Sequence, residues 1–228
     1  MRAAILAWLG AAVVTCTAPA LAQLDRITSQ EAASGLKAAL EKGSRAAVAA
    51  LGRTDGFFGN PQVKIPLPES AQRAEKLMRR FGMGRQADEL ILAMNRAAEA
   101  AVPEARQLFV DAVRKMTVQD AKGILQGGDT AGTAYFRRST EGALRKRFLP
   151  IVKKATANVG LAQRYNEYAE RGVTFGLVKK EDANLDAYVT QKALDGLFWM
   201  VAEEETKIRR DPVGAGTSII RKVFGAIR

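Results

Sequence analysis

Several polar and charged residues lie among apolar residues of helical spacing and could together do carboxylate chemistry. They are Asn95, Arg96, Glu99, Asp129, Tyr135, Arg137, Asp195 and Glu203. Asn95 and Glu99 are four residues apart, so they share one face of a helix. If all these groups faced one another they would line a cleft, in which Arg96 or Arg137 would pair with a buried carboxylate. The same residue types also form interhelical networks that fix helix packing, and we favour that interpretation.

The composition excludes most other chemistry. The chain has no histidine, and its single cysteine lies in the N-terminal apolar segment. Catalytic triads and cysteine–histidine pairs are therefore excluded, as are the usual ligands of zinc, copper and haem, and we expect no cofactor and no metal. Asp182, Asn184 and Asp186 have the spacing that opens a calcium-binding loop. Ala187 and Ala193 stand where that loop needs glycine and glutamate, so helix capping explains the spacing better.

Carboxylate-dependent cleavage of envelope glycan is the enzymatic alternative, with Glu69 or Glu99 as the acid. Peptidoglycan-cleaving enzymes that resemble lysozyme and use one glutamic acid often carry Glu-Ser, Gly-Leu-x-Gln and Tyr-Asn motifs. The matching stretches here are Glu69-Ser70, Gly160-Leu-Ala-Gln163 and Tyr165-Asn166. The first two are close neighbours in those enzymes but lie far apart in this chain, so we attribute the match to chance.

The chain is strongly basic, with a formal net charge of +11. A charge of this size favours anionic partners such as membrane headgroups or acidic wall polymers. The densest run is Arg145, Lys146 and Arg147, and Arg221 and Lys222 lie in the C-terminal segment. Most other cations come in scattered pairs, which is also typical of solvent-exposed helix faces.

Residues 1–22 have the pattern of a secretory signal peptide. A positive charge precedes an apolar run at 3–14, and Ala20-Leu21-Ala22 fits the cleavage site. We therefore expect an exported, periplasmic protein that begins at Gln23, has no transmembrane span after cleavage and meets no nucleic acid. The alternative is a lipid anchor on Cys16, which we disfavour because threonine precedes it where a lipoprotein has a small residue.

Hydrophobic periodicity predicts helices along almost all of residues 23–228, hence one all-α domain and no second domain. The helices are predicted at residues 28–51, 69–82, 86–101, 104–116, 117–127, 129–160, 162–171, 185–209 and 218–228. We expect Gly43-Ser44 to interrupt the first helix and Pro150 to kink or restart the sixth.

Residues 55–68 break the helical pattern with turn dipeptides and prolines, and are called the strap below. Apolar residues stand at every second position of 63–67, which predicts either a short edge strand or an extended segment lying across the helices. The prolines argue against a central strand. Phe57 and Phe58 are expected to hold the strap down.

The C-terminal segment 216–228 is predicted to be amphipathic. Its shared apolar face consists of Ile219, Ile220, Val223, Phe224 and Ile227. Such a helix either lies on a membrane surface or docks on its own core, and we favour docking on the core.

The chain resembles a bacterial family known as domain of unknown function 4197. The stretches that carry the resemblance are Asp55-Gly-Phe-Phe-Gly-Asn-Pro61, Ile65-Pro-Leu-Pro-Glu-Ser70, 87–90, 94–104, 116–120, 127–129, 135–137, 148–154, 193–198 and 211–214. The resemblance implies an exported, mainly helical protein, and it implies no catalytic residue.

These observations favour a non-enzymatic binding module for an envelope partner, which is a protein, an anionic lipid or a wall polymer. The alternatives are a carboxylate-dependent glycan hydrolase or lyase, and a binder of small apolar ligands between helices. A cleft with an isolated, desolvated carboxylate would favour the enzyme, whereas a flat basic face would favour the binding module.

Overall fold

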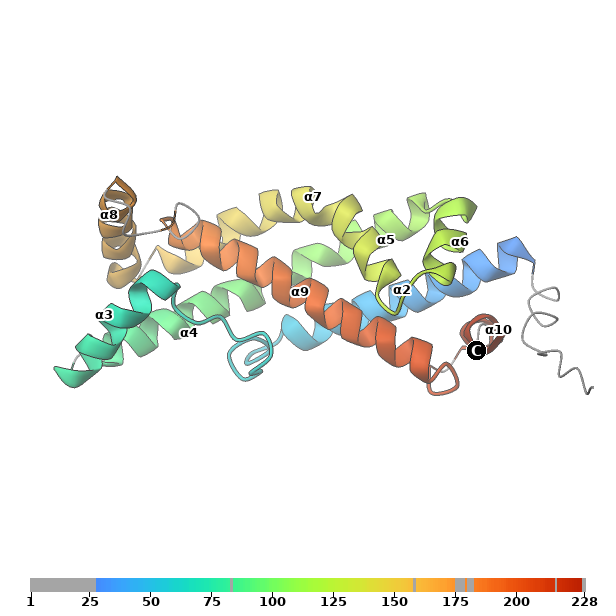
Figure 1. Cartoon of the computed structure of the whole chain (residues 1–228), viewed down its shortest axis with the longest axis horizontal. Helices are drawn as coiled ribbons and strands as arrows, with labels where there is room; N and C mark the ends of the chain where they lie inside the picture. Colours follow the sequence, from blue (N-terminus) through green and yellow to red (C-terminus); the bar gives the residue numbers. More distant parts are fainter. Residues whose placement is uncertain are drawn as a thin grey trace, which may run out of the picture.

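The computed structural model describes residues 28–226, except 83, 158, 175–178, 180–182 and 216. These residues form an elongated bundle of helices without a strand, so the predicted all-α domain is confirmed (Figure 1). The elements are α2 (Ser29–Leu51), α3 (Glu69–Arg80), α4 (Gly84–Ala101), η1 (Val102–Glu104), α5 (Ala105–Lys115), α6 (Val118–Gln126), α7 (Ala131–Thr156), α8 (Gly160–Thr174), α9 (Leu185–Arg210) and α10 (Ser218–Ala226). The predicted signal peptide lies outside the described residues, so it stays a prediction.

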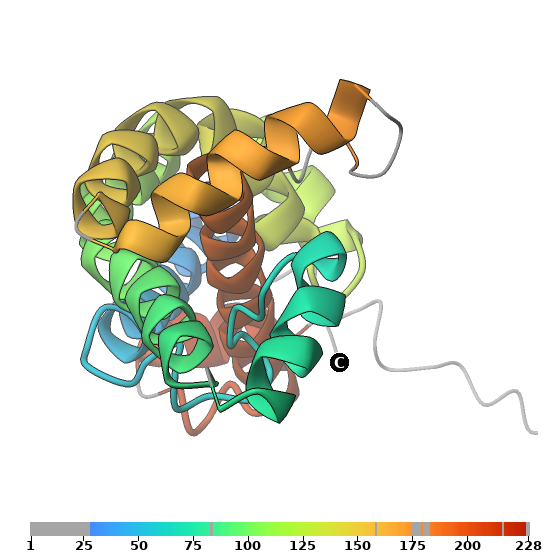
Figure 2. The same ribbon diagram turned by 90° about the vertical axis from the view of Figure 1, so that its left-hand side faces the viewer.

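Helix α9 is the centre of the bundle, with α2, α4 and α7 around it (Figure 2). Its apolar residues recur at helical spacing, and Leu194, Leu197 and Phe198 are buried. On α7 the buried side chains recur every four residues, so the apolar stripe winds around the helix and packs on α4, α5 and α9. Phe109 joins these helices to α5, because its ring lies 4.6 Å from that of Phe136 and 6.1 Å from that of Phe198.

The predicted interruption at Gly43-Ser44 is wrong, and so is a restart of the helix at Pro150. Helix α2 continues through Gly43-Ser44, where the Ser44 hydroxyl donates to the carbonyl of Glu41 and a Cβ on Gly43 would lie 3.4 Å from Cβ of Glu204. That distance is an ordinary van der Waals contact, so the glycine marks neither a turn nor a forced close approach. Helix α7 likewise does not restart at Pro150, which lies on its exposed side, and it ends at Thr156.

Residues 55–59 and 61–63 of the strap form hydrogen-bonded turns, so the expected extended form is wrong for them. Residues 64–68 have no regular secondary structure, and no described residue within the strap pairs as a strand. The apolar residues Val63, Ile65 and Leu67 are buried, as the alternation predicts. Phe57 is also buried, whereas Phe58 is half-buried and carries Lys64 Nζ 4.1 Å above its ring. Phe57 thus anchors the strap, while Phe58 belongs to its surface.

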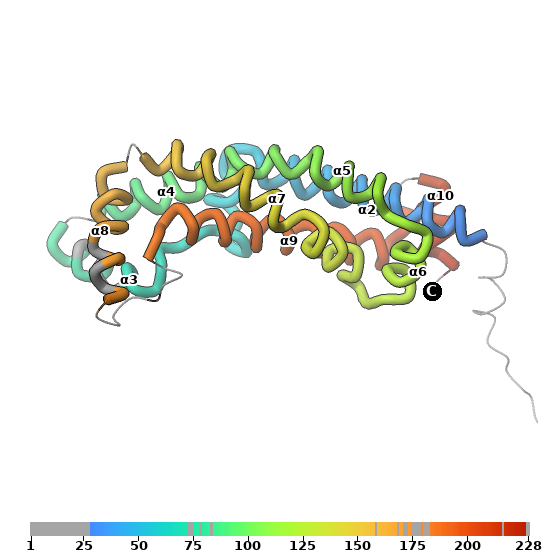
Figure 3. Tube along the Cα trace, turned by 90° about the horizontal axis from the view of Figure 1, so that it is seen from above, coloured from blue at the N-terminus to red at the C-terminus, as the bar shows by residue number. Residues whose placement is uncertain are grey.

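The two ends of the bundle are built differently. Helices α6 and α10 lie at one end, and α3 and α8 at the other (Figures 1 and 3). Helix α10 docks on α2, with Ile220, Val223 and Phe224 buried, so the expected docking of the tail on its own core is confirmed. A Cβ on Gly35 of α2 would lie 2.5 Å from Cγ2 of Val223, so only glycine admits α10 this closely.

Candidate functional site

Glu99 on α4 holds the first part of the strap. Only 4% of this residue is exposed, and its Oε1 accepts hydrogen bonds from the backbone N–H groups of Phe57 (3.0 Å) and Phe58 (3.1 Å). Arg96 Nη1 donates to Oε2 at 2.6 Å, and Arg96 Nη2 donates to Asp55 at 2.7 Å. These two contacts, the one to Glu99 first, raise the pKa of the Arg96 guanidinium, so the cation persists and balances the buried carboxylate.

Asn95 holds the second part of the strap. Its side chain is fully buried, and its Oδ1 accepts from the backbone N–H of Ile65 at 2.8 Å. Its Nδ2 donates to the carbonyl of Ile65 at 2.9 Å and to that of Ile91 at 2.8 Å. One amide thus makes the two hydrogen bonds that a neighbouring strand would make. This contact explains why a strand-like alternation folds here without a strand partner.

Neither candidate acid sits in a catalytic environment. The Glu69 side chain is 81% exposed and lies 3.6 Å from Lys179 Nζ. Glu99 is buried, but both of its oxygens are engaged by the strap and Arg96. The structure does bring two of the short motifs together, because the Ser70 and Tyr165 hydroxyl oxygens lie 3.1 Å apart. That contact joins α3 to α8, while the neighbouring carboxylate of Glu69 faces solvent.

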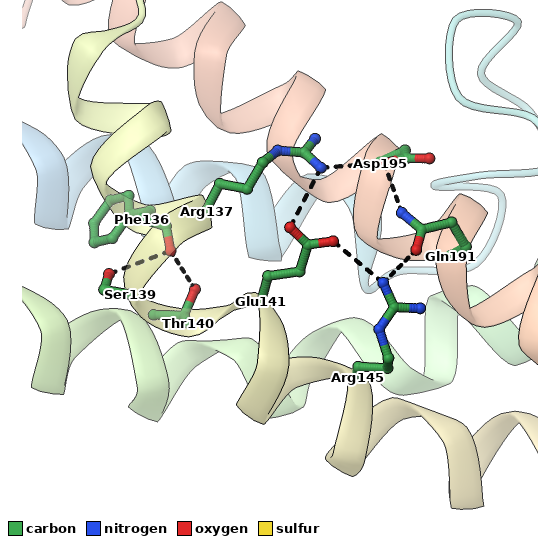
Figure 4. A network of polar contacts seen from close by, with 8 residues as sticks. All are labelled: Phe136, Arg137, Ser139, Thr140, Glu141, Arg145, Gln191 and Asp195. Atoms are coloured by element: carbon green, nitrogen blue, oxygen red, sulfur yellow. Dashed lines mark hydrogen bonds and ion pairs between the residues drawn. The ribbon is translucent and has the colours of Figure 1, made fainter.

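Arg137 and Asp195 belong to a surface network between α7 and α9 (Figure 4). Arg137 Nη1 lies 3.3 Å from Asp195 and 3.6 Å from Glu141, and its guanidinium stacks over Phe198 at 4.6 Å. Arg145 pairs with Glu141 at 3.2 Å and also donates to the Gln191 amide, which itself donates to Asp195 at 3.0 Å. The members are partly exposed, so they fix the helix–helix packing and form no desolvated site.

The remaining candidates lie elsewhere. Asp129 is exposed in the turn before α7, and Glu203 is exposed on α9. The Tyr135 hydroxyl donates to the carbonyl of Ala112 at 2.9 Å, and burial raises its pKa. The candidate residues do not line one cleft, because each side chain is turned by its helix toward a different neighbour. The expected pairing of Arg96 with a buried carboxylate is confirmed.

The sequence analysis missed the second buried carboxylate, Glu205. Its Oε1 accepts from the backbone N–H of Gly132 at 2.9 Å, and its Oε2 accepts from the backbone and the hydroxyl of Thr133 at 2.7 and 2.9 Å. Arg209 neutralises it at 2.9 Å and also donates to the carbonyl of Ile124 at the end of α6. Glu205 thus caps the N-terminus of α7 from a distant helix. The available signals were the four-residue spacing from Arg209 and the lack of an acidic residue in the first turn of α7.

The densest basic run does not form one patch. Consecutive helical residues point about 100° apart, so Arg145 turns toward α9, and Arg147 turns toward Glu104, 3.4 Å away. Lys146 alone faces away from the bundle and makes no ion pair among the described residues. In the tail, Lys222 pairs with Glu31 at 2.6 Å, and Arg221 is exposed.

Three hollows in the described structure bear on the hypothesis of a small ligand bound between helices. One lies between the strap and the α3–α4 hairpin, holds about 490 Å³ and is lined by Phe58, Lys64, Arg79 and Ile91 among others. A second, of about 260 Å³, lies between the strap and Trp199 on α9. The apolar cavity beneath α10 holds only about 10 Å³, which is room for one water at most. Among the described residues no group of three His, Cys, Asp or Glu could hold a metal ion.

The family comparison gives the identity of the chain. No helix in the described part of the chain is long and apolar enough to cross a membrane. No curated protein and no solved structure matches the sequence. The model of the family described as protein of unknown function (DUF4197) matches residues 26–225. This match covers all but the two ends of the chain, which therefore belongs to the DUF4197 family.

Proposed function

We propose that the protein is a non-enzymatic binding module for an extended anionic partner in the cell envelope. The observation that carries the proposal is the outward face of α7. Arg138, Lys146 and Lys153 lie on this face, opposite the buried stripe, and none of them makes an ion pair with another described residue. This row of three cations is called the α7 basic row below.

The geometry of the α7 basic row suits a partner with repeated negative charges. Its members are seven or eight residues apart, which places them about 11 to 12 Å from one another along a helix. The exposed residues between them include Gly142 and Pro150, whose side chains are small and uncharged. The only carboxylate of α7 is Glu141, which is engaged by Arg137 and Arg145 on the side of α9. The row therefore presents three exposed cations with no unengaged carboxylate of α7 beside them.

The polar interior supports a non-catalytic role. Glu99 and Glu205, the two buried carboxylates of the described residues, each accept several hydrogen bonds and pair with an arginine. In the part of the chain that the structure describes, Thr190 Oγ1 is the only buried side-chain oxygen or nitrogen without a hydrogen-bond partner. A general acid for glycan cleavage needs a desolvated carboxyl group that can donate its proton to the substrate and is not already engaged by other protein groups. Export to the periplasm, expected from residues 1–22, would bring the basic surface to wall polymers and headgroups.

Binding to polyphosphate tests the proposal. The chain beginning at Gln23 retains every described residue and is the form to use. Replacing Arg138, Lys146 and Lys153 with glutamine should weaken binding at least about tenfold and flatten its salt dependence. The matched control removes the same charge from other helices, with glutamine at the exposed Arg106, Arg114 and Lys122. Equal losses in both variants would contradict a specific surface, and no binding at low salt would refute the anionic partner.

A further inference from the structure

The end of the α3–α4 hairpin exposes apolar side chains. Of the six large hydrophobic residues that are exposed in the described structure, three lie on this hairpin: Leu77, Phe81 and Leu92. Phe81 is 71% exposed and Leu77 is 54% exposed, and they are four residues apart on one face. None of the α3 side chains that the structure describes is fully buried. This exposure is unlike that of α10, whose apolar face is covered by α2.

The turn that follows α3 projects these residues outward. Gly82 adopts a positive φ of 74° and ends the helix, and α4 begins two residues later at Gly84. Phe81 is therefore the last residue before a glycine with positive φ, and a second glycine, Gly84, begins α4. Figure 1 shows the hairpin at the extremity of the molecule, opposite α6 and α10. A convex apolar tip of this kind can enter a lipid surface without rearrangement of the bundle.

Cations flank the tip. Arg79 is paired with Glu75 at 2.6 Å and with Asp88, so both of those carboxylates are neutralised. Lys76 and Arg80, next to Leu77 and Phe81, are exposed and make no ion pair with another described residue. Exposed apolar residues interleaved with unpaired cations are typical of helices that lie in the headgroup region of anionic bilayers.

We propose that the tip of the α3–α4 hairpin, Lys76, Leu77, Arg80 and Phe81, docks on an anionic phospholipid bilayer. This inference rests on the proposed function and names a lipid surface as one anionic partner. Phe81 and Leu77 enter the boundary between headgroups and acyl chains, while Lys76 and Arg80 contact phosphates. An acidic protein is disfavoured as the occupant, because two exposed apolar side chains offer a small area for a stable protein–protein interface.

Co-sedimentation with phosphatidylglycerol vesicles tests the inference. In the chain beginning at Gln23, Leu77→Ser with Phe81→Ser should lower the vesicle partition coefficient at least about tenfold, since each side chain buried in lipid contributes about one factor of ten. Polyphosphate binding should be unchanged. Val213→Ser is the control, because Val213 is 69% exposed and lies in the turn before α10. Circular dichroism should show the native helix content for all variants.

The outcomes separate the two proposals. Full vesicle binding by the Leu77→Ser, Phe81→Ser variant would overturn the inference and leave the proposed function standing. If the wild-type chain binds polyphosphate but not vesicles, the inference is likewise overturned and the proposed function stands. If it binds neither, both the inference and the proposed function are refuted. A spectroscopic probe checks insertion directly: Trp199 is the only tryptophan after residue 22, so Phe81→Trp with Trp199→Phe places one reporter at the tip. Its emission should shift to the blue on vesicles, and an unchanged emission would contradict insertion.

Discussion

The two ends of the bundle carry amphipathic helices that use their apolar residues in opposite ways. Helix α10 buries Ile220, Val223 and Phe224 against α2, whereas α3 leaves Leu77 and Phe81 exposed. The basic residues of the two helices also differ in whether they are paired. Lys222 of α10 pairs with Glu31 of α2, while Lys76 and Arg80 of α3 make no ion pair within the described residues. An amphipathic sequence alone therefore does not identify a surface-binding helix. Whether its apolar face is exposed depends on whether the rest of the chain provides a surface that covers it.

Removal of α10 should have the largest effect on stability. Deleting residues 217–228 uncovers the surface that three large apolar side chains occupy, each contributing about 1.5–3 kcal/mol. We expect the Tm to fall by about 10 °C or more, while polyphosphate binding at low temperature persists. Thermal unfolding followed by circular dichroism measures the first effect. Loss of binding with an unchanged Tm would instead make α10 the surface helix.

Replacement of Glu205 should come next. Glu205→Ala leaves two backbone N–H groups of α7 and the Arg209 cation without their partner, which should cost about 3–5 kcal/mol. Glu203→Ala, two residues away and exposed, should change stability by no more than about 0.5 kcal/mol. Urea denaturation of both variants measures the difference. Similar values would show that the carboxylate does not hold this end together.

Replacement of Asn95 should have a smaller and more local effect. Asn95→Ala leaves the buried backbone N–H and carbonyl of Ile65, a strap residue, without hydrogen-bond partners. This should lower the free energy of unfolding by about 1–3 kcal/mol. Limited proteolysis should then cut within residues 55–68 before the rest of the bundle. The exposed amide Gln119→Ala is the control and should leave the strap protected. An intact strap in Asn95→Ala would contradict its attachment through this side chain.

The pH dependence of the α2–α10 contact should be the smallest effect. Hydrogen bonds from Lys222 and then Thr28 lower the pKa of Glu31 below its ordinary value of 4.5. The ionised carboxylate is thus favoured in the folded state, so its stabilising contribution is complete above pH 4.5 and disappears as the pH falls through the lowered pKa. Glu31→Gln should therefore reduce the decline of Tm below pH 4.5. Identical acid profiles for variant and wild type would contradict the contact.

Local signals in the sequence predicted most of the fold. The helices predicted at residues 28–51, 117–127 and 185–209 each correspond to an observed element. The predicted break at Gly43-Ser44 was wrong, because the buried packing of α2 on its neighbours outweighs the low helix propensity of these two residues. The role of Glu205 was not predicted, because its spacing from Arg209 is a weak signal and its other partners are backbone groups of α7, more than seventy residues away. The α3 tip was missed for the same reason, since exposure depends on which surfaces the remainder of the chain covers.

Hydrogen exchange with and without phosphatidylglycerol vesicles tests the contrast between the two helices most directly. We predict that peptides from α10 are protected in solution and unchanged by vesicles. Peptides spanning residues 69–81 should exchange rapidly in solution and become protected on vesicles, because the tip then lies in the headgroup region. Protection by vesicles at α10 with none at residues 69–81 would contradict the account.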